Sequence, residues 1–107
     1  AVGGAAQGIG ATLLEELVYD DSGQLLAGSF MDYLLPTSTD VPPIESIVLE
    51  EAPSPLNPLG VKGAGEGGIV ATGATLANAV SNALAPLGVQ ITQLPLSPSF
   101  IAKLLSG

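Results

Sequence analysis

Charged side chains are confined to one part of this chain. All ten Asp and Glu residues lie within residues 15–66, and residues 67–107 carry a single charged side chain, that of Lys103. Hydrophobic residues make up 47% of the sequence and charged residues only 11%, against about a quarter in ordinary domains. A chain with so few polar groups cannot cover all of its apolar surface. We therefore expect a piece of a larger domain rather than a small soluble domain rich in Ala and Gly.

Composition also excludes several functions. The net charge is −8, with two lysines and neither Arg nor His, so nucleic acids and anionic membrane surfaces are not expected partners. The absence of both Cys and His removes zinc sites, thiol catalysis and a Ser-His-Asp triad, and we expect no metal ligands in this chain. No apolar run reaches the roughly 18 residues of a membrane span. We expect a cytoplasmic location.

The periodicity of apolar residues predicts about three helices and several short strands. Helices are expected over residues 2–18, from a start at either Gly68 or Thr72 to Pro86, and from Ser97–Pro98 onward. Strands are expected over residues 44–50 and 89–94, and short extended segments on either side of a turn at residues 20–23. This mixture without βαβ alternation predicts a small α+β domain.

Four glycines interrupt the first expected helix, and each lowers its stability by about 1 kcal/mol in the helix interior. They are Gly3, Gly4, Gly8 and Gly10. Because only a residue without Cβ lets another backbone approach closely, we expect this side of the helix to pack against another backbone.

The candidate functional residue is Glu66, which lies in the glycine cluster of residues 60–68. A carboxylate in such a loop suits a catalytic base. Two other interpretations remain open: an acid that stabilises a helix N-terminus, and a partner of Lys62. The cluster also matches G-x-G-x-x-G at residues 63–68, but a proline-rich connector precedes it and no acid follows, so a small nucleotide-binding module is a weak alternative. For four further polar residues we expect ordinary surface positions: Gln7, Gln24, Tyr33 and Asp40.

Several segments, in this order and spacing, carry a resemblance to a known family. They include Gln7-Gly8-Ile9-Gly10, residues 21–25, residues 32–36, the motif Lys62-Gly63-Ala64-Gly65-Glu66-Gly67-Gly68 and the Ala-rich stretch 77–80. Together they resemble the C-terminal part of the molybdopterin-binding large subunit of the xanthine oxidase family, with the greatest likeness to carbon monoxide dehydrogenase large chains. The likeness runs through nearly all of residues 1–107, which we expect to be a C-terminal segment of one molybdopterin-binding domain.

The resemblance implies a chemistry for the site. Glu66 matches the family's glutamate beside the molybdenum, a general base in the oxidative hydroxylation of carbon monoxide, an aldehyde or an N-heterocycle. Gly63, Ala64 and Gly65 would form the loop that brings Glu66 to the cofactor, which would be molybdopterin, as its cytosine dinucleotide. The implied partners are the remainder of the large subunit and the iron–sulfur and FAD subunits or domains that take up electrons.

The chain also departs from the family pattern. The family's large subunit is several times longer, and most pterin-contacting segments, including a glutamine that would fall just before Ala1, are absent. We therefore expect the isolated chain to be an inactive fragment that binds no cofactor and exposes apolar faces able to self-associate. The alternative is a non-catalytic structural or interaction domain.

Overall fold

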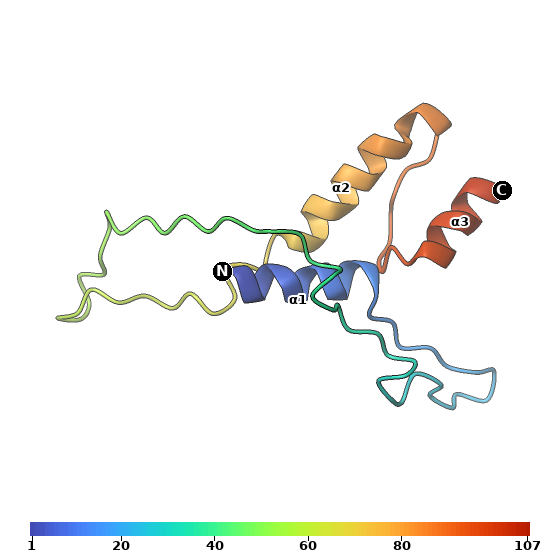
Figure 1. Ribbon diagram of the computed structural model, residues 1–107, viewed down its shortest axis with the longest axis horizontal. Helices are drawn as coiled ribbons and strands as arrows, with labels where there is room; N and C mark the ends of the chain where they lie inside the picture. The colour runs from blue at the N-terminus through green and yellow to red at the C-terminus, as the bar shows by residue number, and fades with distance from the viewer.

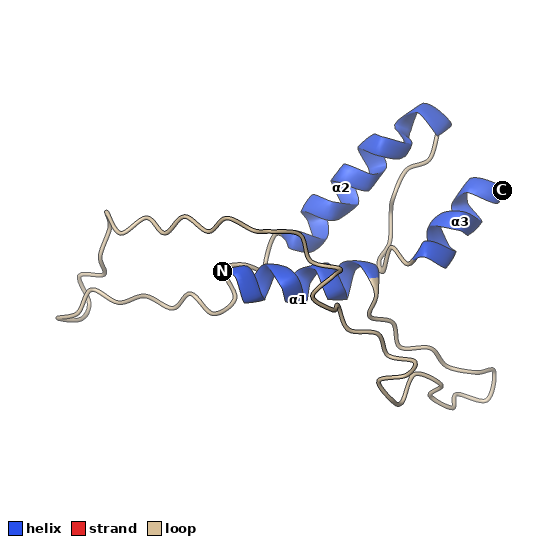
Figure 2. Cartoon of the chain, viewed as in Figure 1, coloured by secondary structure: helices blue, strands red, loops and turns tan.

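The computed structural model describes all 107 residues and contains three α-helices and no β-strand (Figures 1 and 2). Helix α1 spans Val2–Leu13, and α2 spans Thr72–Leu84 and continues into the 3-10 turn η1, Ala85–Leu87. Helix α3 spans Pro98–Ser106. The predicted α+β class is therefore wrong, because none of the segments expected to be strands forms a ladder of backbone hydrogen bonds with a neighbouring strand. The structure is a helical one with long irregular connections.

Helix α1 packs against the chain that leads into α2. A Cβ at Gly4 would lie 3.0 Å from Gly68 Cα, and a Cβ at Gly8 would lie 2.6 Å from Thr72 Cβ. Real Cβ atoms essentially never come closer than the first of these distances, so a side chain at Gly8 would displace Thr72, and one at Gly4 would fit only if the Gly68 backbone gave way by a few tenths of an ångström. The expectation that this side of α1 packs closely against another backbone is confirmed at Gly4. At Gly8 the neighbour is the Thr72 side chain rather than backbone, and Gly3 has open space around it.

The helix ends follow from local signals. Helix α1 stops at Leu13 rather than near residue 18, since the N–H groups of Leu14 and Glu15 both donate to the Gly10 carbonyl. After η1 the chain turns at Gly88, whose φ of 73° is left-handed and suits glycine. Ser97 caps α3 as predicted, accepting a hydrogen bond from the Phe100 N–H at 3.3 Å, and Pro98 is the first helical residue.

The strand predicted over residues 44–50 belongs instead to a long arm, residues 41–64, that projects from the helices (Figure 1). Its two legs share one backbone hydrogen bond, from Ser54 N to Gly60 O at 3.0 Å, so no ladder forms. Near the tip, the Asn57 amide side chain brackets Val61, accepting from its N–H and donating to its carbonyl. Ile47 and Leu49 are 77% and 79% exposed. The segment is extended, as its sequence suggested, but without a partner it is not a strand.

The strand predicted over residues 89–94 is also wrong. The Ile91 N–H donates to the Ser81 hydroxyl of α2 at 2.9 Å, so this segment is held by a helix side chain and not by a neighbouring strand. A few residues later the Leu96 N–H donates to the Thr12 carbonyl of α1 at 2.6 Å. Leu96 is one of the few buried side chains, at 3% exposure.

The turn predicted at residues 20–23 is present. Asp20 Oδ1 accepts hydrogen bonds from the Ser22 N–H, the Ser22 hydroxyl and the Gln24 N–H, and Gly23 has a φ of 84°. The Ser22 hydroxyl, followed by the Gln24 N–H, holds the pKa of Asp20 below its ordinary value. The flanking extended segments are reduced to one antiparallel bridge between Tyr19 and Leu25.

The chain does not enclose a core of its own. Its radius of gyration is 17.8 Å, whereas a compact domain of this length has about 13 Å. Its accessible surface is 8036 Å², against about 5,500 Å² for a folded monomer of this mass. Only five residues are buried, which are Gly8, Gly10, Thr12, Ala27 and Leu96. They lie mainly around α1, so this helix is the centre of what packing there is.

A side-chain hydrogen bond ties the loop of residues 17–36 to the end of α1. The Tyr33 hydroxyl donates to Glu15 Oε2 at 2.6 Å, and the other oxygen of Glu15 lies beside Gly10, which the ring of Pro36 also covers. The bond to Glu15, with smaller effects of desolvation and of the Glu15 charge, raises the pKa of Tyr33 above 10.0. Glu15 is half-buried as a result.

Substitution of Gly8 by alanine should lower stability. The new Cβ meets the branched Thr72 side chain, and such overpacking costs about 1–3 kcal/mol, which over most of this range exceeds the gain of about 1 kcal/mol in helix propensity. Gly3→Ala is the matched control, because nothing lies within 4 Å of its Cβ position, and it should raise stability. Unfolding midpoints of the two variants measure both effects, and equal midpoints would contradict the packing argument.

Removal of the Tyr33 hydroxyl should produce a pH-dependent loss of stability. A raised pKa means that the hydrogen bond to Glu15 stabilises the protein below pH 10 and that this contribution is lost as the pH rises through the raised pKa. Tyr33→Phe should therefore be less stable than the unmodified protein at pH 7, with the difference shrinking above pH 10. Thermal melts from pH 7 to 11 test this, and a pH-independent difference would refute it.

Candidate functional site

Glu66 lies in the turn of residues 65–71 that precedes α2, and it is exposed. Its carbonyl accepts hydrogen bonds from the N–H groups of Ile69 at 3.1 Å and Val70 at 3.3 Å, which closes a single helical turn. No hydrogen bond within the chain engages its carboxylate. The carboxylate is thus available to a molecule outside the chain.

The position of Glu66 argues against a helix-capping role. Helix α2 begins at Thr72, its N-cap is Ala71, and its first turn holds no acidic residue. The interaction of a charge with a helix terminus falls off within the first turn, and Glu66 lies five residues before the cap. Of the two starts considered for this helix, Gly68 and Thr72, the structure has Thr72.

The chain on the two sides of Glu66 differs in packing. On the C-terminal side, Gly68 lies against α1: a Cβ there would meet the carbonyl oxygen of Ala1 and would lie 3.0 Å from the Ala5 nitrogen. On the N-terminal side, Gly63 and Gly65 have nothing within 4 Å of their Cβ positions. Glu66 therefore sits where a loop with open space meets an anchored backbone.

The open side fits close approach by a ligand. The backbone N–H groups of Gly63, Ala64, Gly65 and Glu66 donate no hydrogen bond within the chain, and all four residues are exposed. Free N–H groups on glycine-rich backbone can bind the oxygens of a phosphate-bearing cofactor. The backbone here leaves room and free donors for a ligand beside one carboxylate.

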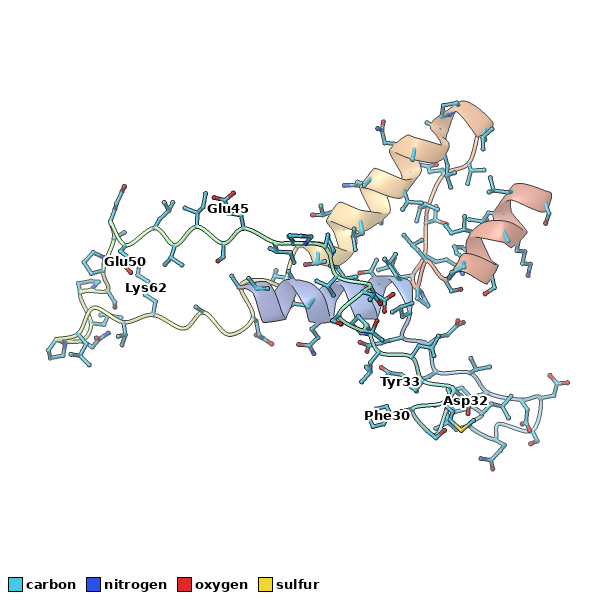
Figure 3. The ribbon with its side chains drawn as sticks, viewed as in Figure 1. Phe30, Asp32, Tyr33, Glu45, Glu50 and Lys62 are labelled. Atoms are coloured by element: carbon cyan, nitrogen blue, oxygen red, sulfur yellow. The ribbon has the colours of Figure 1, made fainter.

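Lys62 lies apart from this arrangement. It lines an open hollow of about 530 Å³ between the legs of the arm, together with Glu50, and both side chains are in the outer part of the arm (Figure 3). The structure shows no ion pair between Lys62 and Glu66. The G-x-G-x-x-G match fails on context as well, since no strand precedes residue 63 and no helix begins until Thr72.

The other polar candidates have ordinary surroundings. Gln7 and Gln24 are exposed, as expected. Asp40 accepts from the Thr37 hydroxyl and the Thr37 N–H, both at 2.7 Å, and these bonds lower its pKa. Tyr33 is the exception because it holds Glu15, a contact for which the spacing in sequence offers no signal.

No group of three or more His, Cys, Asp or Glu side chains is arranged to hold a metal ion. None of the helices is both long enough and apolar enough to cross a membrane.

Comparison with known proteins shows which family the sequence of the chain resembles. Residues 1–42 match the family model described as a molybdopterin cofactor-binding domain. The chain is 46% identical, over 106 residues, to subunit gamma of the 6-hydroxypseudooxynicotine dehydrogenase complex of Paenarthrobacter nicotinovorans. It is 37% identical, over 93 residues, to the carbon monoxide dehydrogenase large chain of Afipia carboxidovorans. The sequence motifs suggested the greatest likeness to carbon monoxide dehydrogenase large chains. Of these two relatives, however, the carbon monoxide enzyme has the lower sequence identity.

The fold of the chain matches part of a solved structure. The crystal structure of quinoline 2-oxidoreductase from Pseudomonas putida 86 superposes with a TM-score of 0.88 at 49% identity, over 97% of this chain and 13% of that chain. The two curated relatives are likewise covered over only 13% and 11% of their lengths, while 99% and 87% of this chain is aligned. The chain thus corresponds to roughly one eighth of a much longer protein. It belongs to the molybdopterin-binding large subunits of the xanthine oxidase family.

Proposed function

We propose that this chain is the part of a molybdenum hydroxylase large subunit that supplies the general base, Glu66. The observation that carries the proposal is the geometry around this residue: an exposed carboxylate without an internal partner, anchored on one side and preceded by open glycine backbone. Alignment of nearly the whole chain with large subunits of this type supports it.

In this proposal different residues of the chain bind the cofactor and transfer the proton. The backbone N–H groups of Gly63, Ala64 and Gly65 would bind the molybdopterin cofactor, for which we propose the cytosine dinucleotide form. When bound, this cofactor accepts two electrons from the substrate. Glu66 would accept the proton of the group that attacks the substrate carbon, a role that contributes about 10²–10⁴-fold to the rate of an enzyme.

For the substrate we propose an N-heteroaromatic compound rather than carbon monoxide. The names of the two relatives with the higher identities refer to quinoline and to a nicotine-derived compound, at 49% and 46%, whereas the carbon monoxide enzyme is 37% identical. The further partners of this proposal are the remainder of the large subunit, and iron–sulfur and FAD subunits or domains that take electrons from the cofactor.

Glu66→Gln in the intact large subunit should lower kcat by about 10²–10⁴-fold, because the amide cannot accept the proton. The content of molybdenum should stay unchanged, since the substitution preserves the shape of the side chain. Glu45→Gln is the matched control, an exposed carboxylate of the arm (Figure 3), and should keep the full rate. Steady-state rates with quinoline and nicotine as trial substrates, normalised to molybdenum, provide the measurement, and a full rate for Glu66→Gln would refute the role of this residue.

The 107-residue chain produced alone should hold no molybdenum and show no turnover. Its 8036 Å² of exposed surface includes apolar side chains such as Leu56, at 92% exposure, so we expect it to self-associate. Elemental mass spectrometry and analytical ultracentrifugation measure the two properties. Near-stoichiometric molybdenum in this chain would mean that residues 1–107 suffice to form a cofactor site.

A further inference from the structure

Thr72 joins three parts of the site. Its hydroxyl donates to the Gly68 carbonyl at 2.8 Å. Its side chain also fills the space that α1 leaves open at Gly8: Thr72 Cβ, Cγ2 and Oγ1 lie 2.6, 2.8 and 2.8 Å from where a Gly8 Cβ would be. The side chain therefore touches α1 while it holds the carbonyl two residues after Glu66.

Gly68 is held from the other direction as well. A Cβ at this position would meet the Ala1 carbonyl and would lie 3.0 Å from the Ala5 nitrogen, and the Gly4 position faces the Gly68 Cα at 3.0 Å. The peptide of Gly68 is thus confined between the first turn of α1 and the Thr72 hydroxyl. The N–H groups of Ile69 and Val70, the two residues after Gly68, donate to the Glu66 carbonyl and so close the turn that carries Glu66.

On the basis of the proposed function of Glu66, we propose that Thr72 is a positioning residue for this base. The Thr72 hydroxyl holds the Gly68 carbonyl, and Gly68 is part of the turn that the Glu66 carbonyl closes. In this way Thr72 restrains the backbone that carries the Glu66 carboxylate. No internal partner restrains the carboxylate, and the glycines before it have open space. Before Glu66 the chain offers only one long hydrogen bond, from the Gly67 N–H to the Ala64 carbonyl at 3.3 Å, so the tighter restraint comes from the residues that follow. A misplacement of a catalytic group by about 1 Å can cost 10²-fold in rate.

A hydroxyl bonded to the carbonyl four residues earlier is common for threonine in helices, and Thr75 provides the comparison within this chain. Thr75 Oγ1 donates to the Ala71 carbonyl, also at 2.8 Å, but Thr75 is exposed. The two residues make the same local bond, and only Thr72 makes it to a carbonyl confined against α1. Thr75→Val therefore removes an equivalent hydroxyl bond without touching the proposed restraint.

The test uses the intact large subunit loaded with its cofactor. Thr72→Val should lower kcat about tenfold with KM and molybdenum content unchanged, whereas Thr72→Ser, which keeps the hydroxyl, should restore the rate. Thr75→Val should behave as the unmodified protein does. If valine disturbs the contact with Gly8, Thr72→Ala removes the hydroxyl with a smaller side chain and should show the same loss.

Hydrogen exchange supplies a readout that does not depend on turnover. The amides of Ile69 and Val70, which bond to the Glu66 carbonyl, should exchange faster in Thr72→Val than in either Thr72→Ser or Thr75→Val. A purely packing role for Thr72 predicts instead that Thr72→Ser, which lacks the methyl group, is impaired as much as Thr72→Ala. Impairment of Thr72→Ser to that degree, or unchanged exchange in Thr72→Val, would overturn the inference.

The double variant Glu66→Gln/Thr72→Val separates this inference from the proposed function. If Thr72 acts through Glu66, the double variant should be no slower than Glu66→Gln alone. A further tenfold loss would show that Thr72 acts independently and would overturn the inference. A full rate for Glu66→Gln would remove the proposed function and the inference with it. A slow Glu66→Gln beside a fully active Thr72→Val would remove the inference alone.

Discussion

The close contact between α1 and the chain at Gly68 and Thr72 is the interaction on which the rest of the structure depends. It brings residues 4–8 against residues 68–72, more than sixty positions later in the sequence. Glycine at positions 4, 8 and 68 makes this approach possible, since any Cβ there would lie at or inside the shortest distance that real Cβ atoms show. Glycine lowers the intrinsic stability of α1 by about 1 kcal/mol at each helical position. The helix therefore forms this contact and is in turn stabilised by it. Residues 14–67 form two long loops that lead away from this contact and return to it (Figure 1).

These two loops bury few side chains within the chain. The surface exceeds that of a compact monomer of this mass by roughly half, and the arm presents side chains such as Ile47, Leu49 and Leu56 to solvent. The same path of the chain recurs in quinoline 2-oxidoreductase, where it forms 13% of a much larger polypeptide. An extended arm with apolar side chains and unpaired backbone groups is reasonable in such a setting, because surrounding protein can cover it. Isolated in water, it has no such compensation.

The sequence was sufficient to predict features that depend on neighbouring residues. The cap at Ser97–Pro98, the end of α2 near Pro86 and Gly88, and the turn at residues 20–23 are all local, and all were correctly predicted. The strands over residues 44–50 and 89–94 were wrong because a strand requires a partner. Alternation of apolar and polar residues describes which sides of an extended chain are apolar, and it does not identify what lies beside them. Here residues 89–94 found the Ser81 hydroxyl of a helix, and residues 44–50 found no partner.

The same distinction, between features set by neighbouring residues and features that need a distant partner, applies to the site. The contiguous motif made Glu66 and the glycines before it candidates, and the exposed, unpartnered carboxylate is compatible with the proposed role, which stays a prediction. Thr72 was considered only as a helix start, since its contact with Gly8 depends on how α1 crosses the chain. The hydrogen bond between Tyr33 and Glu15 likewise joins residues eighteen positions apart, and the local sequence gives no signal for it. A base needs both freedom to reach its substrate and a defined direction. For the role proposed for Glu66, the open glycines before it would supply the first, and the confined peptide after it would supply the second.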